Sequence, residues 1–86
     1  MLIDLDDVRR TVGLVLGRRD PKADARIEAD LGAESLDVLN LVATLEDKYG
    51  ISIDEAALAS VSTVRDLYHL LLKSSDGAIP PTEPAG

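Results

Sequence analysis

The core of this chain has to be built almost without aromatic side chains. The sequence contains no Phe and no Trp, and Tyr49 and Tyr68 are its only tyrosines. Leu, Val, Ile and Ala must therefore fill the interior, and a domain of this length buries only about 60% of the surface that its unfolded chain exposes. Aliphatic side chains favour helices packed on helices over a β-sandwich, which prefers aromatic and β-branched residues. We therefore expect one small all-α domain.

Apolar residues spaced three or four apart predict a first helix within residues 2–16 that ends at Leu16. Gly17 follows as a residue that can end a helix in the left-handed conformation. Residues 18–34 mix charges with Pro21 and Gly32 and are expected to form a long ordered loop. Connections of this length in a compact domain usually have a functional reason. The apolar residues that mark the helix are Leu5, Val8, Val12, Val15 and Leu16.

The remaining elements have clear start and stop residues. A second helix is predicted from Ser35 to Tyr49, ended by Gly50. Asp54 is a suitable cap for a short third helix, and Ser62 or Thr63 for a last helix that runs to about residue 73. Together these elements predict a small four-helix bundle, with three longer helices, one short helix and a long loop between the first two.

The C-terminal residues differ in composition from the rest. Three of the four prolines lie in residues 74–86, among small polar residues that cannot pack a core. We therefore predict a helical domain over residues 1–73 and a disordered Pro-rich tail over residues 74–86.

The formal charge of −7 makes nucleic acid and anionic membranes poor partners. Residues 28–55 carry eight acidic side chains and one basic side chain, Lys48. This concentration favours a partner protein with a basic surface, although a solvated face that aids solubility would look the same.

No run of residues approaches the roughly 20 apolar residues that span a bilayer. The N-terminus lacks the pattern of a signal peptide, so we expect a cytosolic protein. We also expect a monomer.

Residues 30–37 place Ser35 where the long loop becomes the second helix. A hydroxyl in this position can be reached from solvent, and Gly32 permits a tight turn before it. A serine here could equally be a simple helix cap. No cysteine is present, so any thiol chemistry requires an attached group.

The second helix carries two apolar stripes. The first, at helical spacing, consists of Val38, Leu41, Val42, Leu45 and Tyr49 and can enter the core. The second consists of Leu36, Leu39 and Ala43, among acidic residues. An exposed apolar strip beside acids suits a helix that docks on a partner, whereas a wide core-facing stripe would explain the same residues.

The segment Asp30-Leu31-Gly32-Ala33-Glu34-Ser35-Leu36-Asp37 resembles the Asp-Leu-Gly-Ala-Asp-Ser-Leu-Asp signature of the acyl carrier protein family in all places but one. The similarity continues through residues 41–51 and 62–67 and covers about residues 3–73. It implies that a phosphopantetheinyl transferase attaches 4′-phosphopantetheine from coenzyme A to Ser35. An acyl group would then be carried as a thioester on the terminal thiol of that arm.

The resemblance also implies a docking surface for basic partner enzymes. The partners would be the transferase and acyl-loading, ketosynthase-type or acyltransferase enzymes. The expected contact residues are Glu34, Leu36, Asp37, Leu39, Glu46 and Asp47. Two departures from the family pattern leave the partner set open, since Glu34 replaces the usual Asp and Asn40 stands where many fatty-acid carriers have an acid.

The pathway remains open between fatty-acid, polyketide and related specialised biosynthesis. An aminoacyl or peptidyl carrier and an unmodified helical adaptor are the alternatives. A serine hydrolase is disfavoured because no base accompanies Ser35: the one histidine, His69, belongs to the last helix, and no Gly-x-Ser-x-Gly elbow surrounds Ser35. The sequence thus predicts a carrier that is not an enzyme, without catalytic residues or a metal site.

Overall fold

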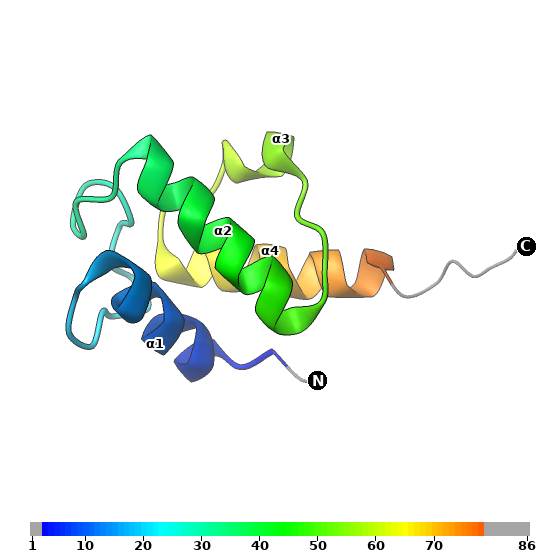
Figure 1. The fold of residues 1–86 in the computed structure, drawn as a ribbon, viewed down its shortest axis with the longest axis horizontal. Helices are drawn as coiled ribbons and strands as arrows, with labels where there is room; N and C mark the ends of the chain where they lie inside the picture. The colour runs from blue at the N-terminus through cyan, green and yellow to red at the C-terminus, as the bar shows by residue number, and fades with distance from the viewer. Residues whose placement is uncertain (1–2, 79–86) are drawn as a thin grey trace, which may run out of the picture.

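A computed structural model describes residues 3–78 of the chain and contains four helices. They are α1 (Leu5–Leu16), α2 (Ser35–Tyr49), α3 (Glu55–Leu58) and α4 (Val64–Ala78). In Figure 1, α1 and α2 lie side by side, α4 runs at an angle to them, and a long loop joins α1 to α2 at one end of the molecule. The predicted all-α fold, with three longer helices and one short one, is confirmed.

Local sequence signals set most of the helix ends. Gly17 and Gly50, which follow α1 and α2, have φ values of 68° and 66°, a conformation that only glycine adopts readily. Thr63 caps α4, since its Oγ1 accepts a hydrogen bond of 3.0 Å from the N–H of Asp66. The Asp66 carboxylate in turn accepts from the N–H of Thr63 at 3.1 Å. This reciprocal pair decides between Ser62 and Thr63 as the cap.

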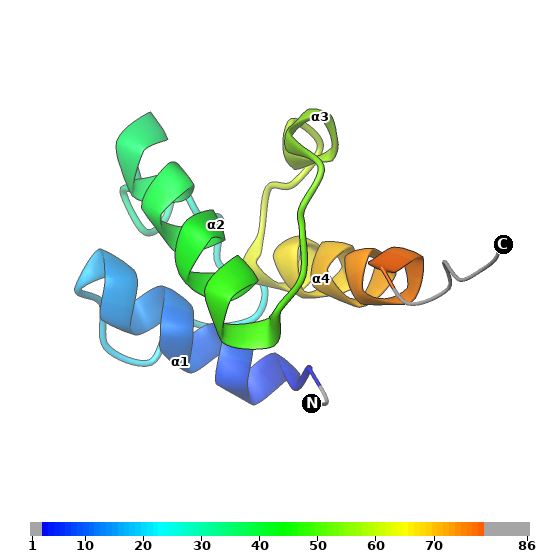
Figure 2. The same ribbon diagram turned by 45° about the vertical axis from the view of Figure 1, so that its right-hand side comes forward.

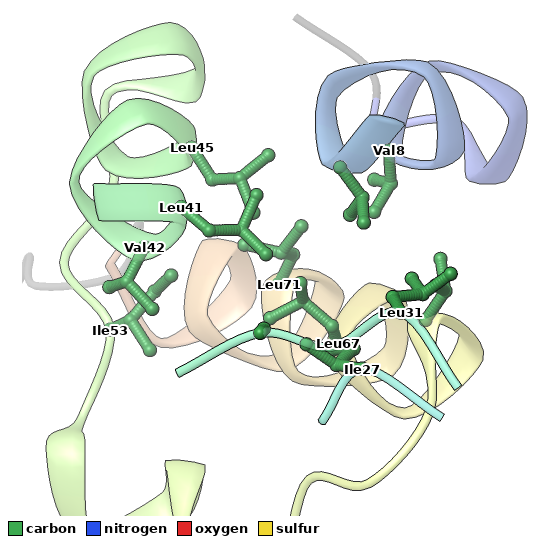
Figure 3. Close-up of a cluster of buried hydrophobic side chains, with 12 residues drawn as sticks. Val8, Ile27, Leu31, Leu41, Val42, Leu45, Ile53, Leu67 and Leu71 are labelled. Carbon is green, nitrogen blue, oxygen red and sulfur yellow. The ribbon is translucent and has the colours of Figure 1, made fainter. Parts of the chain in front are cut away.

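The core lies between α1, α2 and α4, and its buried hydrophobic side chains within the described residues are all aliphatic. Figure 3 shows Leu41 and Leu45 of α2 pointing into the space between Val8 of α1 and Leu71 of α4. These four side chains are fully buried. Because aliphatic side chains fill the centre of the bundle, close helix packing rather than large rings excludes water from it.

The long loop is ordered by pairing with the start of α4. The N–H of Ile27 donates to the carbonyl of Ser62 at 2.8 Å, and the N–H of Val64 donates to the carbonyl of Ala25 at 3.1 Å. A single antiparallel bridge joins Arg26 to Thr63. Ile27 and Leu31, two apolar residues of the loop, are both buried in the core.

The short helix α3 stands apart from the rest of the bundle. None of its residues is buried, and Figure 2 shows it projecting away from α1 and α2. Asp54 caps it as predicted, because its Oδ1 accepts a hydrogen bond of 3.0 Å from the N–H of Ala56. The helix is therefore held by its cap and by a few partly buried side chains.

The last helix is longer than predicted. It continues to Ala78 instead of ending near Lys73, so residues 74–78 are helical. Small polar residues were expected to leave the helix there, but Ser74 and Ser75 are half-buried and the first proline after them is Pro80. The prediction of disorder for residues 79–86 lies outside the described residues. Within residues 3–78, no helix is long and apolar enough to cross a bilayer.

Candidate functional site

Ser35 is the first residue of α2, and its side chain is exposed. The cap position belongs to Glu34, so the alternative in which Ser35 serves as the cap is wrong. The backbone N–H of Glu34 donates to the Asp37 carboxylate at 2.9 Å, which fixes the first turn without using the serine. Within the described residues, the Ser35 hydroxyl has no hydrogen-bond partner, and it is free to react with an incoming group.

A compact turn in front of α2 holds this serine at the surface. Gly32 has a φ of 72°, and the carbonyl of Leu31 accepts a hydrogen bond of 3.0 Å from Nε of Arg18. The N–H of Ala33 donates to the carbonyl of Ile27 at 3.1 Å, and the Ala33 side chain is buried. The segment is thus anchored on both sides, and Ser35 follows it in a defined position.

The start of α2 also suits a phosphate group. The N–H groups of Ser35 and Leu36 donate to no protein acceptor among the described residues, as is usual in the first turn of a helix. Such groups, together with the helix dipole, favour a negative charge. A phosphodiester on the Ser35 oxygen would lie next to them, so the residues present fit a phosphopantetheine group.

The second apolar stripe of α2 faces solvent. Leu36 is 68% exposed and Leu39 is 52% exposed, although both are large apolar side chains. The wide core-facing stripe, which was the other explanation for these leucines, is therefore wrong. Leu41, Val42 and Leu45 form the core face instead.

The four acids named from the sequence play different parts. Glu34 and Asp47 are exposed. Asp37 is half-buried and bonded to the N–H of Glu34. Glu46 is also half-buried, and its Oε2 accepts a hydrogen bond of 2.7 Å from the N–H of Ile53, in the segment between α2 and α3. No sequence pattern predicts this hydrogen bond, because it depends on where the segment after α2 turns back.

A cavity of about 360 Å³ opens between α2, α3 and the loop that precedes α2. Its apolar lining comes from four separate parts of the chain, which no sequence motif brings together. The lining includes Ile27, Val38, Leu41, Val42, Leu58, Val61 and Leu67, with the polar residues Arg26, Glu28 and Ser62.

His69 lies exposed on α4. Its ring contacts Tyr68, with the ring centroids 5.6 Å apart. In the described part of the chain it shares no hydrogen bond with Ser35, and no cluster of residues there could hold a metal ion.

Comparison with known proteins decides the family. The sequence model for a phosphopantetheine attachment site matches residues 6–71. An acyl carrier protein of Sulfurovum is 40% identical over 63 residues, which make up 71% of this chain and 84% of that protein. The chain belongs to the acyl carrier protein family.

Other members of the acyl carrier protein family support the assignment. An acyl carrier protein of Thermotoga maritima is 40% identical over 50 residues, or 58% of this chain, and the match spans 62% of that relative. The structure of the acetyl actinorhodin acyl carrier protein of Streptomyces coelicolor superposes with a TM-score of 0.71 at 32% identity, covering 91% of this chain and 96% of that one. The resemblance seen in residues 30–37 is thereby confirmed for the whole domain, and 4′-phosphopantetheine is the cofactor of the family.

Proposed function

We propose that Ser35 is the attachment residue and that the chain carries acyl intermediates in fatty-acid, polyketide or related specialised biosynthesis. The exposed Ser35 hydroxyl, anchored at the start of α2 and unused by the fold, is the observation that carries the proposal. When bound, the cofactor supplies a terminal thiol on which an acyl group is held as a thioester. The chain itself supplies position, exposure and the positive end of a helix.

The chain leaves the chemistry of attachment to a second protein. Among the described residues no base is hydrogen-bonded to Ser35, so the group that removes the hydroxyl proton must belong to the phosphopantetheinyl transferase. This arrangement supports a carrier without activity of its own. It also requires the transferase to dock closely around α2.

The docking surface that we propose is the acidic-apolar face of α2. Leu36 and Leu39 supply exposed apolar contacts beside the carboxylates of Glu34 and Asp47. Basic surfaces on the transferase and on acyl-loading, ketosynthase-type or acyltransferase enzymes would complement this face. Such charge pairing mainly raises the association rate and selects partners, which suits a carrier that visits several enzymes.

Intact mass spectrometry tests the attachment residue. The protein is incubated with coenzyme A and a broadly tolerant phosphopantetheinyl transferase, beside Ser35→Ala and Ser52→Ala variants. Ser52 is a matched control because it is also exposed. A mass gain of one phosphopantetheine group in the parent and in Ser52→Ala, and none in Ser35→Ala, is the expected result. No gain in the parent with several transferases would favour the unmodified adaptor.

The cavity beside α2 is the proposed location for part of the acyl chain. An acyl group in it would bury apolar surface and raise the melting temperature of the loaded protein. Ala59 lines this cavity, whereas Ala57 lines a separate hollow between α3 and α4. We expect Ala59→Phe to reduce the rise in melting temperature that follows loading with a long acyl chain. Ala57→Phe should leave that rise unchanged. An equal melting temperature for loaded and unloaded parent would exclude sequestration.

A further inference from the structure

The positive charge of this acidic protein is concentrated in one short segment. Residues 9–22 hold five basic side chains and one acidic side chain, a formal charge of +4. The rest of the chain holds four basic and fifteen acidic side chains, a formal charge of −11. The molecule is therefore strongly polarised, and the segment from α1 into the long loop has the opposite sign to the acidic-apolar face of α2.

The fold keeps this positive charge together. After α1 the chain turns back onto the helix, and a Cβ placed on Gly13 would lie 2.6 Å from the carbonyl oxygen of Arg18. Nε of Arg9 donates to the carbonyl of Pro21 at 2.8 Å. The start of the loop thus lies against the C-terminal half of α1 instead of extending away from it.

The one acid in the segment is already paired. Asp20 forms an ion pair of 2.6 Å with Arg9, which also pairs with Asp6 at 2.9 Å. Among the described residues, Arg10 has only a distant partner, the Asp7 carboxylate at 3.8 Å, and the side chain of Arg10 is 70% exposed. The remaining bases of the segment are Arg18, Arg19 and Lys22, which are all exposed.

Leu14 belongs to the same basic segment of the chain. It is 84% exposed, more than Leu36 or Leu39 of α2, and it is one helical turn from Arg10. A single exposed leucine is common on protein surfaces. An exposed leucine one turn from Arg10, in one segment with three further exposed bases on an otherwise acidic domain, has the composition of a small contact surface with an apolar centre and a charged rim.

We propose that Arg10, Leu14, Arg18, Arg19 and Lys22 form a second docking surface, the basic α1 face, for a partner protein that presents acidic side chains around a small apolar recess. A carrier held through this surface would keep the acidic-apolar face of α2 available to an enzyme. An extended polyanion fits less well. A membrane or nucleic acid reaches beyond the Debye length of about 8 Å and meets the −11 charge of the remaining chain as well.

The test is a titration of the isotopically labelled full chain, followed by amide NMR. The probe is a short helical peptide with glutamates flanking one phenylalanine, compared with a scrambled peptide of equal composition. The expected result is saturable shifts around Arg10, Leu14 and Arg19, weaker binding by the scrambled peptide, and loss of affinity at high salt. Equal binding of both peptides, or shifts centred elsewhere, would overturn the proposal.

Variants locate the surface. Leu14→Ser combined with Arg10→Ser should weaken peptide binding about tenfold. The matched control is Leu72→Ser combined with Lys73→Ser on α4, which also pairs an exposed leucine with an exposed base. Arg19→Glu with Lys22→Glu provides a second test that leaves α1 intact. Unchanged affinity in both α1-face variants would contradict the assignment.

A third experiment distinguishes a protein partner from a membrane surface. Vesicles of equal parts phosphatidylcholine and phosphatidylglycerol should not sediment the protein. The surface would instead be assigned to lipid if the protein bound the vesicles but not the peptide, and if Arg19→Glu combined with Lys22→Glu abolished vesicle binding. That result would overturn the proposal of a protein partner. The whole experiment is run on the parent and on Ser35→Ala, so its outcome is independent of cofactor attachment.

Discussion

The Tyr49 hydroxyl, at the end of α2, donates a short hydrogen bond to the Asp7 carboxylate in the first turn of α1. Lys48 donates to the same carboxylate at 3.1 Å. The tyrosine and the lysine hold the pKa of Asp7 below its ordinary value of 3.8. Burial and the neighbouring Asp7 raise the pKa of Tyr49, so the hydroxyl keeps its proton and remains a donor.

This link makes part of the stability of the fold dependent on pH. Because the pKa of Asp7 is lower in the folded state than in the unfolded chain, its contribution is present above pH 3.8 and is lost as the pH falls through the folded value. We expect Tyr49→Phe to lower the free energy of unfolding by about 1 kcal/mol at pH 7. Urea unfolding should show that difference shrinking toward pH 2. Tyr68→Phe is the control. If Tyr49→Phe lowered the free energy of unfolding equally at pH 7 and at pH 2, the link would be refuted.

Glu46 separates a structural role from a docking role. Glu46→Ala removes the acceptor of the Ile53 N–H and should destabilise the protein by about 1 kcal/mol while speeding amide exchange at Ile53. Glu46→Gln keeps an acceptor but removes the charge. If Glu46 also contacts basic enzymes, we expect both Glu46→Gln and Asp47→Asn to raise the KM for the transferase. If only Asp47→Asn raised the KM, Glu46 would have a structural role alone, as the hydrogen-bond acceptor for the segment after α2.

The leucines of α2 should affect stability or docking according to the face of the helix on which they lie. Leu41→Ala empties part of the fully buried core and should cost about 2–5 kcal/mol of unfolding free energy. Leu36→Ala, on the exposed face, should change that quantity by less than about 0.5 kcal/mol. We expect Leu36→Ala nevertheless to raise the transferase KM several-fold with little change in kcat. Normal transferase kinetics in this variant would remove Leu36 from the docking surface.

Gly32 and Gly50 offer a matched pair. Both have positive φ, but a Cβ on Gly32 would lie 3.0 Å from an Arg18 guanidinium nitrogen, whereas a Cβ on Gly50 would meet nothing within 4 Å. Gly50→Ala should therefore cost only the backbone strain of about 1–2 kcal/mol. Gly32→Ala should cost more and should also slow cofactor attachment, since it disturbs the turn before Ser35. Equal unfolding free energies for the two variants would show that Arg18 simply moves aside.

Much of the fold follows from short-range signals. The start of α2 at Ser35, its end before Gly50 and the capping of α3 by Asp54 were all predicted correctly. Each of these helix ends is determined by residues next to it in the sequence. The end of α4 was missed, since no local signal shows that Ser74 and Ser75 are half-buried. The exposed stripe with Leu36 was recognised as one of two possibilities, and only packing could decide between them.

Long-range relationships were not visible in the sequence. Asp7 and Tyr49 meet across 42 positions, and neither residue type signals the other. The cavity likewise requires α2, α3 and the long loop to be placed in space. The signature around Ser35 identified the candidate site because it is contiguous, whereas its supporting turn depends on Arg18, outside that signature.

The pairing of residues 23–27 with the start of α4 determines where this domain can be cut. Three backbone hydrogen bonds join Ala23, Ala25 and Ile27 to residues 62–65. A fragment that stops after α3 would lose the strand-like partner of the loop that leads to Ser35. Fusion proteins, split reporters and circular permutants of this carrier therefore need to keep the first turn of α4 paired with the loop, even when their only purpose is to display one serine.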